Sequence, residues 1–274
     1  MATQAEKCAR FQALHQSEKA FVIPNPWDVG SARLLAALGY PALATTSAGF
    51  AYTLGRVDGE VSREEKLAHC KAICDAVDIP VSADMENCFA DSPEGIAETI
   101  GLAAETGLAG CSIEDYTNKP EATIYDFDLA VARVKAGVEA ARRLPFDFTI
   151  TARAENVLRG MYDLDEAIRR LKAYEDVGAD VLYAPGLKDV EQVRAVTGAV
   201  GKPVNVLATK DFTVDALSAA GAKRISLGSW NYLTATGGFL EGARQMKDEG
   251  SFAALGSAAR SPDVAALMKK GKSA

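Results

Sequence analysis

Hydrophobic positions along the chain alternate between short β-forming runs and longer amphipathic runs, from one end to the other. The short runs predict eight strands: Ala20–Pro24, Ala42–Ser47, Val81–Glu86, Gly110–Glu114, Phe148–Arg153, Val181–Pro185, Val204–Ala208 and Arg224–Gly228. The longer runs are rich in Ala, Leu and Glu and predict helices: Ser31–Leu38, Arg63–Ala76, Pro93–Glu105, Leu129–Arg143, Leu164–Val177, Val190–Val196 and Thr213–Ala219.

Glycines punctuate the chain where a predicted helix gives way to a strand. They are Gly39, Gly107, Gly178, Gly201 and Gly221. Glycine suits the left-handed turn that ends a helix, so these junctions indicate parallel strands joined by right-handed crossovers. Eight such strands predict an α/β fold, a (β/α)8 barrel of the TIM type with extra C-terminal helices. The alternative, a doubly wound open sheet, needs a Gly-rich phosphate loop after its first strand, where this chain reads NPWDVGS.

The chain shows no domain boundary, internal repeat or low-complexity segment. We therefore expect residues 1–274 to form a single barrel domain. The tail after Trp230 holds the eighth helix and a further helical pattern. We expect these C-terminal helices, about residues 231–274, to pack on a neighbouring subunit.

Composition and charge narrow the class of protein. The chain is 48% hydrophobic and 24% charged, which is globular composition. Its net charge of -7 disfavours nucleic acid and anionic membranes as partners. Five cysteines without a CxxC motif favour a reducing compartment. With no secretory signal and no spanning apolar run, we expect a soluble, cytoplasmic protein.

Polar side chains gather at the carboxyl ends of the predicted strands, where such barrels carry their active sites. They include Thr45, Ser47, Asp84, Glu86, Glu114, Arg153 and Asn205. Side chains alternate across a strand, and the apolar neighbours Met85, Ile113 and Ala152 are expected to face the helices. The charged side chains should then converge in the lumen.

Asp84, Glu86 and Glu114 would form a cluster of three neighbouring carboxylates, which cannot all remain ionised without compensation. Protonation, a salt-bridge network around Arg153 and a hard divalent cation are the three possible answers. We favour Mg²⁺, with Mn²⁺ as an alternative, because such a cation uses few carboxylates and leaves positions for substrate oxygens.

Histidine and lysine chemistry is not expected at this site. His15 falls in an N-terminal helix and His69 in the second helical region, so both should be packing or surface residues. No lysine lies at a strand end, which disfavours a Schiff-base mechanism, and Lys210 is the nearest exception.

At these strand ends the sequence resembles the isocitrate lyase / phosphoenolpyruvate mutase superfamily, from about Asn25 to Trp230. SADMENCFAD is similar to the family's metal motif Asp-x-Asp-x-Gly-(Phe/Tyr)-Gly, and the segments SIED and TARAEN match its later strand ends. The resemblance implies a metal site at Asp84, Glu86 and Glu114. The expected substrate-binding residues are Thr45, Ser47, Ala48, Gly49, Arg153 and Asn205.

The expected catalytic residues are Arg153, Asp58, Asn118 and Lys119. The lyases of this family carry a Lys-Lys-Cys-Gly-His gate after strand 4, whereas residues 116–125 here contain neither cysteine nor histidine. Isocitrate or methylisocitrate cleavage by the usual general acid is therefore not expected. In the mutase and phosphonopyruvate hydrolase branch the gate carries Lys and Asn, which Asn118 and Lys119 resemble. However, Ala184-Pro185-Gly186 stands where that branch has a histidine.

The resemblance implies an Mg²⁺-dependent enzyme that breaks or forms a C–C or C–P bond of a small 2-oxo acid through an enolate, as a lyase, phosphonomutase or hydrolase does. Pyruvate, oxaloacetate, 2-oxoglutarate and phosphonopyruvate are the candidate substrates. It also implies a homotetramer that exchanges its eighth helix. A non-catalytic 2-oxo acid sensor on the same barrel is the alternative. A phosphate-handling barrel would need a glycine-rich cradle after strands 7 and 8, where only Gly228 occurs.

Overall fold

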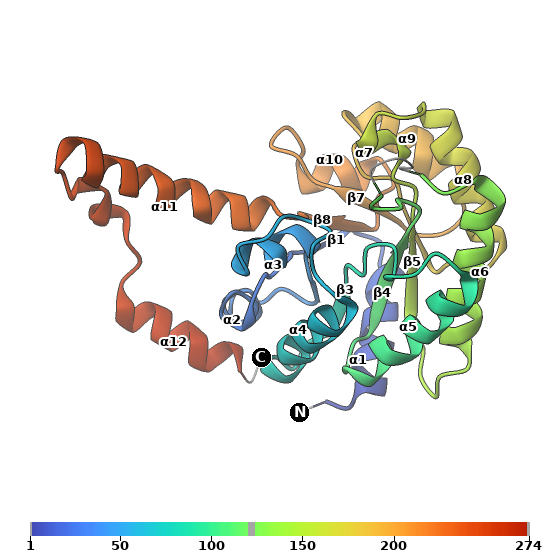
Figure 1. Ribbon diagram of the computed structural model, residues 1–274, viewed down its shortest axis with the longest axis horizontal. Coiled ribbons are helices and arrows are strands. Elements are labelled where there is room, and N and C mark those ends of the chain that lie inside the picture. The colour runs from blue at the N-terminus through green and yellow to red at the C-terminus, as the bar shows by residue number, and fades with distance from the viewer. Residues whose placement is uncertain (1, 120–123, 273–274) are drawn as a thin grey trace.

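The computed structural model describes residues 2–119 and 124–272, in which eight parallel strands form a nearly closed barrel (Figure 1). The strands are β1 (Phe21–Ile23), β2 (Leu43–Ala44), β3 (Val81–Ala83), β4 (Gly110–Glu114), β5 (Thr149–Arg153), β6 (Val181–Tyr183), β7 (Val204–Leu207) and β8 (Arg224–Ser226). Their order is β1-β8-β7-β6-β5-β4-β3-β2, and every pair is parallel. The predicted (β/α)8 barrel is confirmed, and the open-sheet alternative is wrong.

The seam of the barrel lies between β1 and β2, which do not form a ladder with each other. A backbone hydrogen bond from Ala44 N to Pro24 O, 3.1 Å long, joins them instead. The side chain of Asn25 adds two more links, because Nδ2 donates to Thr45 O at 3.1 Å and Oδ1 accepts from Leu227 N at 2.8 Å. One amide side chain thus connects the ends of β1, β2 and β8.

Helices precede, alternate with and follow the strands. They are α1 (Gln4–His15), α2 (Val29–Ala37), α3 (Ser47–Thr53), α4 (Arg63–Ala76), α5 (Pro93–Glu105), α6 (Phe127–Arg142), α7 (Asn156–Arg159), α8 (Leu164–Asp176), α9 (Val190–Ala199), α10 (Val214–Ala219), α11 (Trp230–Glu249) and α12 (Ser261–Gly271), with a 3₁₀-helix η1 (Ala253–Ser257). Side-chain caps fix where many of them begin. Ser62 accepts a hydrogen bond from Glu65 N to start α4, and Ser92 accepts one from Gly95 N to start α5.

The amino ends of the strands are covered by α1. Cys8 and Phe11 of this helix pack against Phe21, Ala42 and Ala109, which lie at or just before the start of β1, β2 and β4. The larger apolar core lies between the strands and the surrounding helices. The carboxyl ends of the strands therefore form the end of the barrel where a site can open.

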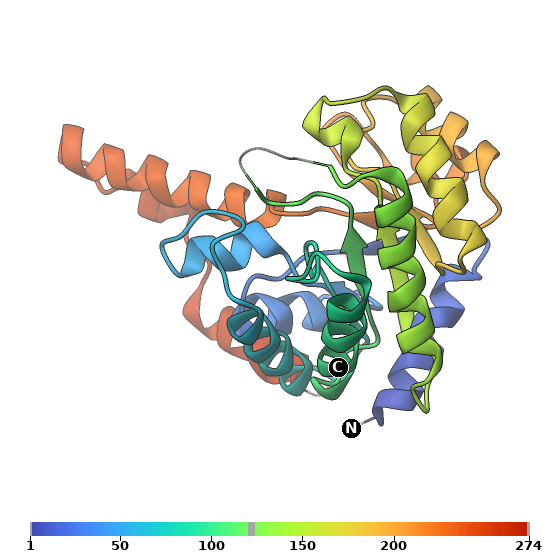
Figure 2. The ribbon, with the colours of Figure 1, turned by 45° about the vertical axis from the view of Figure 1, so that its right-hand side comes forward.

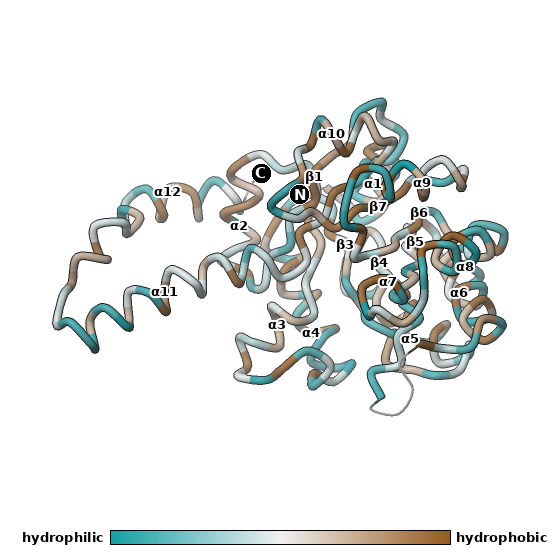
Figure 3. Tube along the Cα trace, turned by 90° about the horizontal axis from the view of Figure 1, so that it is seen from above, coloured by the Kyte–Doolittle hydropathy of each residue, from teal (hydrophilic) through white to brown (hydrophobic). Residues whose placement is uncertain are grey.

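A C-terminal arm, made of α11, η1 and α12, extends away from the barrel (Figures 1 and 2) and is seen from above in Figure 3. Its far end, α12, returns to pack on α2, where a Cβ on Gly271 would lie 1.9 Å from Arg33 O. Large apolar side chains of the arm face solvent, with Phe239 72% and Leu255 62% exposed. No helix in the described part of the chain combines the length and apolar character needed to cross a bilayer.

The close approach of β4 and β5 at Gly110 gives a test of the barrel. A Cβ at Gly110 would lie 2.4 Å from Thr149 O, so we expect Gly110→Ala to destabilise the protein by about 1–3 kcal/mol. Gly101→Ala in α5 is the control. Nothing lies within 4 Å of its added Cβ, and alanine in a helix should gain roughly 0.5–1 kcal/mol. Urea denaturation measures both, and equal stability of the two variants would contradict the packing described.

Candidate active site

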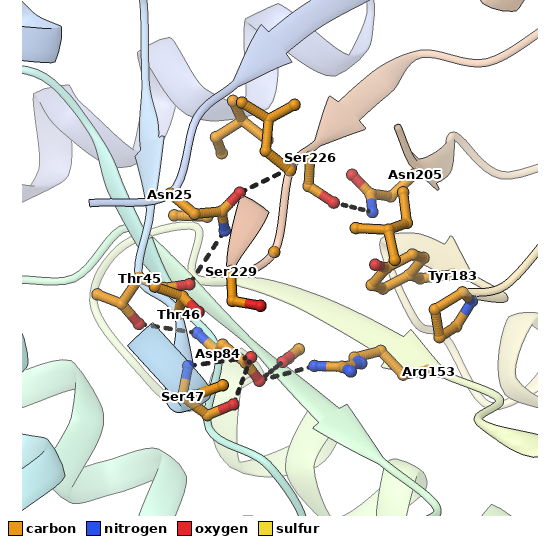
Figure 4. Close-up of a pocket in the computed structure, with 18 of the residues that line it drawn as sticks. Asn25, Thr45, Thr46, Ser47, Asp84, Arg153, Tyr183, Asn205, Ser226 and Ser229 are labelled. Atoms are coloured by element: carbon orange, nitrogen blue, oxygen red, sulfur yellow. Dashed lines mark hydrogen bonds and ion pairs between the residues drawn. The ribbon is translucent and has the colours of Figure 1, made fainter. Parts of the chain in front are cut away.

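A cavity of about 300 Å³ opens at the carboxyl ends of the strands (Figure 4). Its apolar lining includes Leu158, Pro185, Leu207, Trp230 and Leu233. Its polar lining consists of Asn25, Thr45, Thr46, Ser47, Asp58, Ser82, Asp84, Ser112, Arg153, Arg159, Tyr183, Asn205, Arg224, Ser226 and Ser229. The predicted position of the site is thus where the structure has its polar cavity.

Asp84 follows β3 directly and is held on several sides. Oδ1 lies 2.7 Å from Nη1 of Arg153, and Oδ2 accepts from Ser47 through its N–H at 3.4 Å and its hydroxyl at 3.2 Å (Figure 4). The Asp84 N–H donates to Thr45 Oγ1 at 3.1 Å. Burial by itself would raise the pKa of Asp84, but the charges of Arg153 and Lys66 and the backbone donors hold it below its usual range. Asp84 is therefore an ionised carboxylate at the cavity wall.

Arg153, the last residue of β5, gathers three acids around one guanidinium. Besides Asp84, Nη2 lies 3.1 Å from Glu114 Oε2 and 2.7 Å from Glu155 Oε1. Burial works to lower the pKa of Arg153, but these acids raise it well above its usual value. Burial raises the pKa of Glu114 well above its ordinary range, against the opposing effect of Arg153. The salt-bridge network considered from the sequence is therefore present, and Arg153 is already engaged before any substrate binds.

The three-carboxylate metal cluster expected from the sequence is not assembled. The expected third strand is too long, because β3 ends at Ala83 and the chain turns at Glu86 with a φ of 52°. Glu86 does not line the cavity, and its Oε2 accepts instead from Asn118 Nδ2 at 3.2 Å. Within residues 2–119 and 124–272, no three His, Cys, Asp or Glu side chains are placed to hold a metal ion.

The oxygens that do line the cavity still match the chemistry of a hard cation. Asp84 and Asp58 contribute carboxylates, and Ser47 contributes a hydroxyl. Mg²⁺ is commonly held by one or two carboxylates and several waters, so this donor set fits it better than a metal that prefers nitrogen or sulfur. Asp58 lies on the exposed rim of the cavity. Desolvation by the surrounding protein and, next, the charge of Asp84 raise the pKa of its carboxyl group, whereas a hydrogen bond with the Ser47 hydroxyl lowers it.

Lys66 is a charged group that the sequence reasoning missed. It lies on α4 and is fully buried, and its Nζ has no hydrogen-bond partner among the described residues. Its positive charge lowers the pKa of Asp58, Asp84 and Glu86. The signal was a lysine on a helix face otherwise occupied by Cys70 and Ile73, four and seven residues further along.

The remaining substrate residues expected from the sequence are only partly brought together. Ala48 and Asn205 line the cavity, whereas Gly49 does not, because its N–H caps α3 by donating to Thr46 Oγ1 at 3.2 Å. Ser47 begins α3 rather than ending a strand, since β2 stops at Ala44.

The gate segment, residues 116–125, is described except for residues 120–123. Neither Asn118 nor Lys119 lines the cavity. Asn118 binds Glu86, and the Lys119 ammonium pairs with Asp91. The structure therefore does not bring these two expected catalytic residues to Asp84.

The turn after β3 is backbone in an unusual conformation. Glu86, Cys88 and Phe89 have φ of 52°, 58° and 56°, in the left-handed region that favours glycine. The metal motif of the family has Gly at the position of Cys88, and the backbone of Cys88 has the left-handed conformation that glycine adopts most easily. It is fully buried, and burial raises the pKa of its thiol to about 12, so it is a packing residue rather than a reactive thiol.

Both histidines are buried away from the cavity lining, as expected for packing residues. His69 stacks on Phe50 with ring centroids 3.8 Å apart, and Nδ1 of His15 donates to Phe11 O at 2.8 Å.

An ionised carboxylate and a buried arginine at the carboxyl end of a parallel barrel define the class as a (β/α)8-barrel protein with an enzyme-like site. The sequence profile described as phosphoenolpyruvate phosphomutase matches residues 11–247. The chain therefore belongs to the phosphoenolpyruvate mutase family, within the isocitrate lyase / phosphoenolpyruvate mutase superfamily.

Three comparisons place the chain within this superfamily. A crystal structure from Burkholderia cenocepacia J2315, provisionally assigned as a lyase/mutase, has a TM-score of 0.93 and 49% identity, covering 96% of this chain and 95% of that one. The 2-methylisocitrate lyase of Escherichia coli K12 is 29% identical, over 77% of this chain and 74% of its own. Oxaloacetate acetylhydrolase in complex with oxalate has a TM-score of 0.84 and 25% identity, covering 97% and 94%. Other relatives are named as a 2,3-dimethylmalate lyase, an oxaloacetate decarboxylase and, provisionally, a phosphonomutase.

The buried Glu86 gives a pH-dependent prediction. Burial raises its pKa from 4.5 to about 7, so the folded protein retains a proton that the unfolded chain loses across this interval. Stability contributed by Glu86 therefore falls as pH rises from 4.5 to 7, by about 3 kcal/mol in all. We expect Glu86→Gln to raise the free energy of unfolding at pH 8 relative to wild type and to change it little at pH 4.5.

Urea denaturation in EDTA at the two pH values measures this difference. Glu241→Gln, on the exposed face of α11, is the matched control and should leave stability within about 0.5 kcal/mol at both pH values. A Glu86→Gln effect of the same size at pH 4.5 and pH 8 would show that Glu86 does not titrate as described.

Proposed function

We propose that this protein is a divalent-metal-dependent enzyme that breaks or forms a C–C or C–P bond of a small 2-oxo acid. The observation that carries the proposal is the ionised Asp84 at the cavity wall, between the Ser47 hydroxyl and Arg153. Relatives named as a lyase, as oxaloacetate-cleaving enzymes and, provisionally, as a phosphonomutase support the same substrate class.

Mg²⁺, or Mn²⁺ in its place, would be held by Asp84 with Asp58 beside it, and by water. Such a cation, when bound, supplies a Lewis acid for negative charge that builds up on a 2-oxo oxygen. Glu86 and Glu114 are then not direct ligands. Burial raises the pKa of both groups, so the ionised Asp84 is the carboxylate that would attract the cation.

The chain's own groups bind and orient the acid in this proposal. The Ser47 hydroxyl and the Ala48 N–H would bind the substrate carboxylate at the first turn of α3. Because Arg153 is committed to Asp84, Glu114 and Glu155, its role is to position Asp84 rather than to hold the substrate alone. Thr45 holds the Asp84 backbone. Asn118 and Lys119 would act only after leaving their partners Glu86 and Asp91.

The sequence of the gate segment, residues 116–125, distinguishes between two kinds of reaction: cleavage of methylisocitrate and cleavage of a smaller 2-oxo acid or a phosphonate. A methylisocitrate lyase is among the relatives, but residues 116–125 contain no cysteine or histidine to act as its general acid. Cleavage of a smaller 2-oxo acid or of a phosphonate fits this chain better. A non-catalytic sensor on the same barrel is the second candidate, and the partial commitment of Arg153 and Asn205 to protein partners is what favours it.

Metal dependence of binding is the first test. Pyruvate, oxalate and 2-oxoglutarate should bind with measurable heat in Mg²⁺ or Mn²⁺ and lose at least about tenfold in affinity in EDTA. Asp84→Asn should lose metal-dependent binding, because it removes the carboxylate that Arg153 and Ser47 hold at the cavity wall. Asp215→Asn, on the exposed face of α10, should bind like wild type.

Calorimetry with and without EDTA measures these affinities. Binding that survives chelation unchanged, or a folded Asp84→Asn that binds normally, would contradict the metal assignment. A turnover screen with oxo acids and phosphonopyruvate then separates enzyme from sensor, since tight binding without any product would favour the sensor.

We further propose that the C-terminal arm assembles copies of the chain, as in a tetramer that exchanges its eighth helix. The exposed Phe239 and Phe252, 72% and 66% accessible, lie on an arm that extends from the barrel. Apolar side chains so placed are typical of surfaces that bind another subunit.

Light scattering should therefore give a mass of about four times the 28.9 kDa chain. Phe239→Asp should shift this mass toward the single chain, because it places a charge in the contact. Thr234→Asp, an exposed position on the same helix, should not. A wild-type mass of 28.9 kDa would rule out the assembly.

A further inference from the structure

Three arginines line the cavity, and they differ in whether the protein neutralises them. Arg153 has three acidic partners. Arg159 lies 3.4 Å from Glu155 and stacks over the Tyr116 ring at 3.7 Å. Arg224 pairs with no carboxylate of the described residues, and the charged or ionisable groups that act on it are Tyr183 and Arg153.

The partners of Arg224 are neutral. This first residue of β8 is 5% exposed, and Nε donates to Asn205 Oδ1 at 2.9 Å. Nη1 lies 3.4 Å from His15 Nε2, which accepts because the other ring nitrogen donates to Phe11 O. Burial and the charge of Arg224 lower the pKa of His15 to about 3, so the ring stays neutral.

Arg224 therefore carries a buried positive charge that no carboxylate of residues 2–119 and 124–272 neutralises. Burial lowers its pKa to about 10, which is the sign of a guanidinium poorly compensated by its surroundings. A guanidinium has five N–H donors, and the two neutral partners described use two of them. Burying a charge is costly unless an opposite charge accompanies it, and an anion in the cavity would supply one.

The neighbours of Arg224 are suited to an anion. Asn205 and Ser226 line the same part of the cavity and are joined by a hydrogen bond of 2.9 Å (Figure 4). Asp84 and Asp58 lie on the wall formed by β3 and the segment after β2. The cavity thus has an acidic wall suited to a cation and, near β7 and β8, a buried arginine that pairs with no acid in the described part of the chain.

We propose that Arg224 receives the second anionic group of the substrate, so that this site selects 2-oxo acids that carry two acidic groups over those that carry one. The inference rests on the proposed function and deepens it, because it assigns a specificity-determining residue on β8, whereas Asp84 follows β3. In the proposed orientation, the carboxylate and 2-oxo oxygens of the substrate bind near Asp84 and Ser47. The distal carboxylate or phosphonate of the substrate then binds near Arg224.

Calorimetry in excess Mg²⁺ tests this with pyruvate, 2-oxoglutarate and 3,3-difluorooxaloacetate as probes. Wild type should bind one of the two diacids at least about tenfold tighter than pyruvate, as expected for a charge-assisted contact. Arg224→Gln should remove this preference while pyruvate affinity stays within about threefold, and Arg224→Lys should keep part of it.

Several outcomes would overturn the inference. Equal wild-type affinity for pyruvate and both diacids would do so without any variant, so the test survives if Arg224→Gln does not fold. Equal weakening of all three acids in a folded Arg224→Gln would show a structural role only. If wild type binds none of the acids with metal, the proposed function fails first, and this result is distinct from binding without discrimination.

Discussion

The site depends on one arginine that is shared by three carboxylates. Arg153 reaches Asp84, Glu114 and Glu155 from the end of β5, and each of these acids is largely withdrawn from water. Without that positive charge, three neighbouring buried anions would repel one another, and they would protonate or move apart. The guanidinium therefore fixes Asp84 as an anion at the cavity wall. It also ties β3, β4 and β5 together at their carboxyl ends, so the chemistry of the mouth and the closure of the barrel on this side have a common origin.

Most of the fold could be read from the sequence because its signals are local. The helices Arg63–Ala76 and Pro93–Glu105 begin and end as expected, since Ser62 and Ser92 cap them and their apolar faces have helical spacing. Eight strands were found for the same reason. The short helices α3 and α7 were missed, because each begins within three residues of a strand, in a segment assigned to the strand end or the loop after it. The single domain and the packing of the arm on a second subunit stay predictions.

The sequence analysis placed the candidate residues at the end of the barrel where the polar cavity opens, but it did not predict which of them line that cavity. Strand alternation assumed that β3 continues to Glu86, and no sequence rule signals left-handed backbone at a glutamate, a cysteine and a phenylalanine. Alternation also places Arg153 in the lumen without saying which acids it will meet. Lys66 was missed for a similar reason, since a lysine on a helix is normally assigned to the solvent side. Only the tertiary structure shows that it is buried and that its charge acts on the acids of the site.

The seam between β1 and β2 has a consequence for motion. A ladder of hydrogen bonds holds every other pair of neighbouring strands, whereas this pair relies on one backbone bond and on the amide of Asn25. Local opening is easiest where the fewest bonds must break together. Breathing of the barrel should therefore concentrate at this join, and amide protons of β2 should exchange with solvent sooner than those of β4 and β5. The wall of the cavity that carries Ser47 should thus open locally more easily than the wall that carries Arg153.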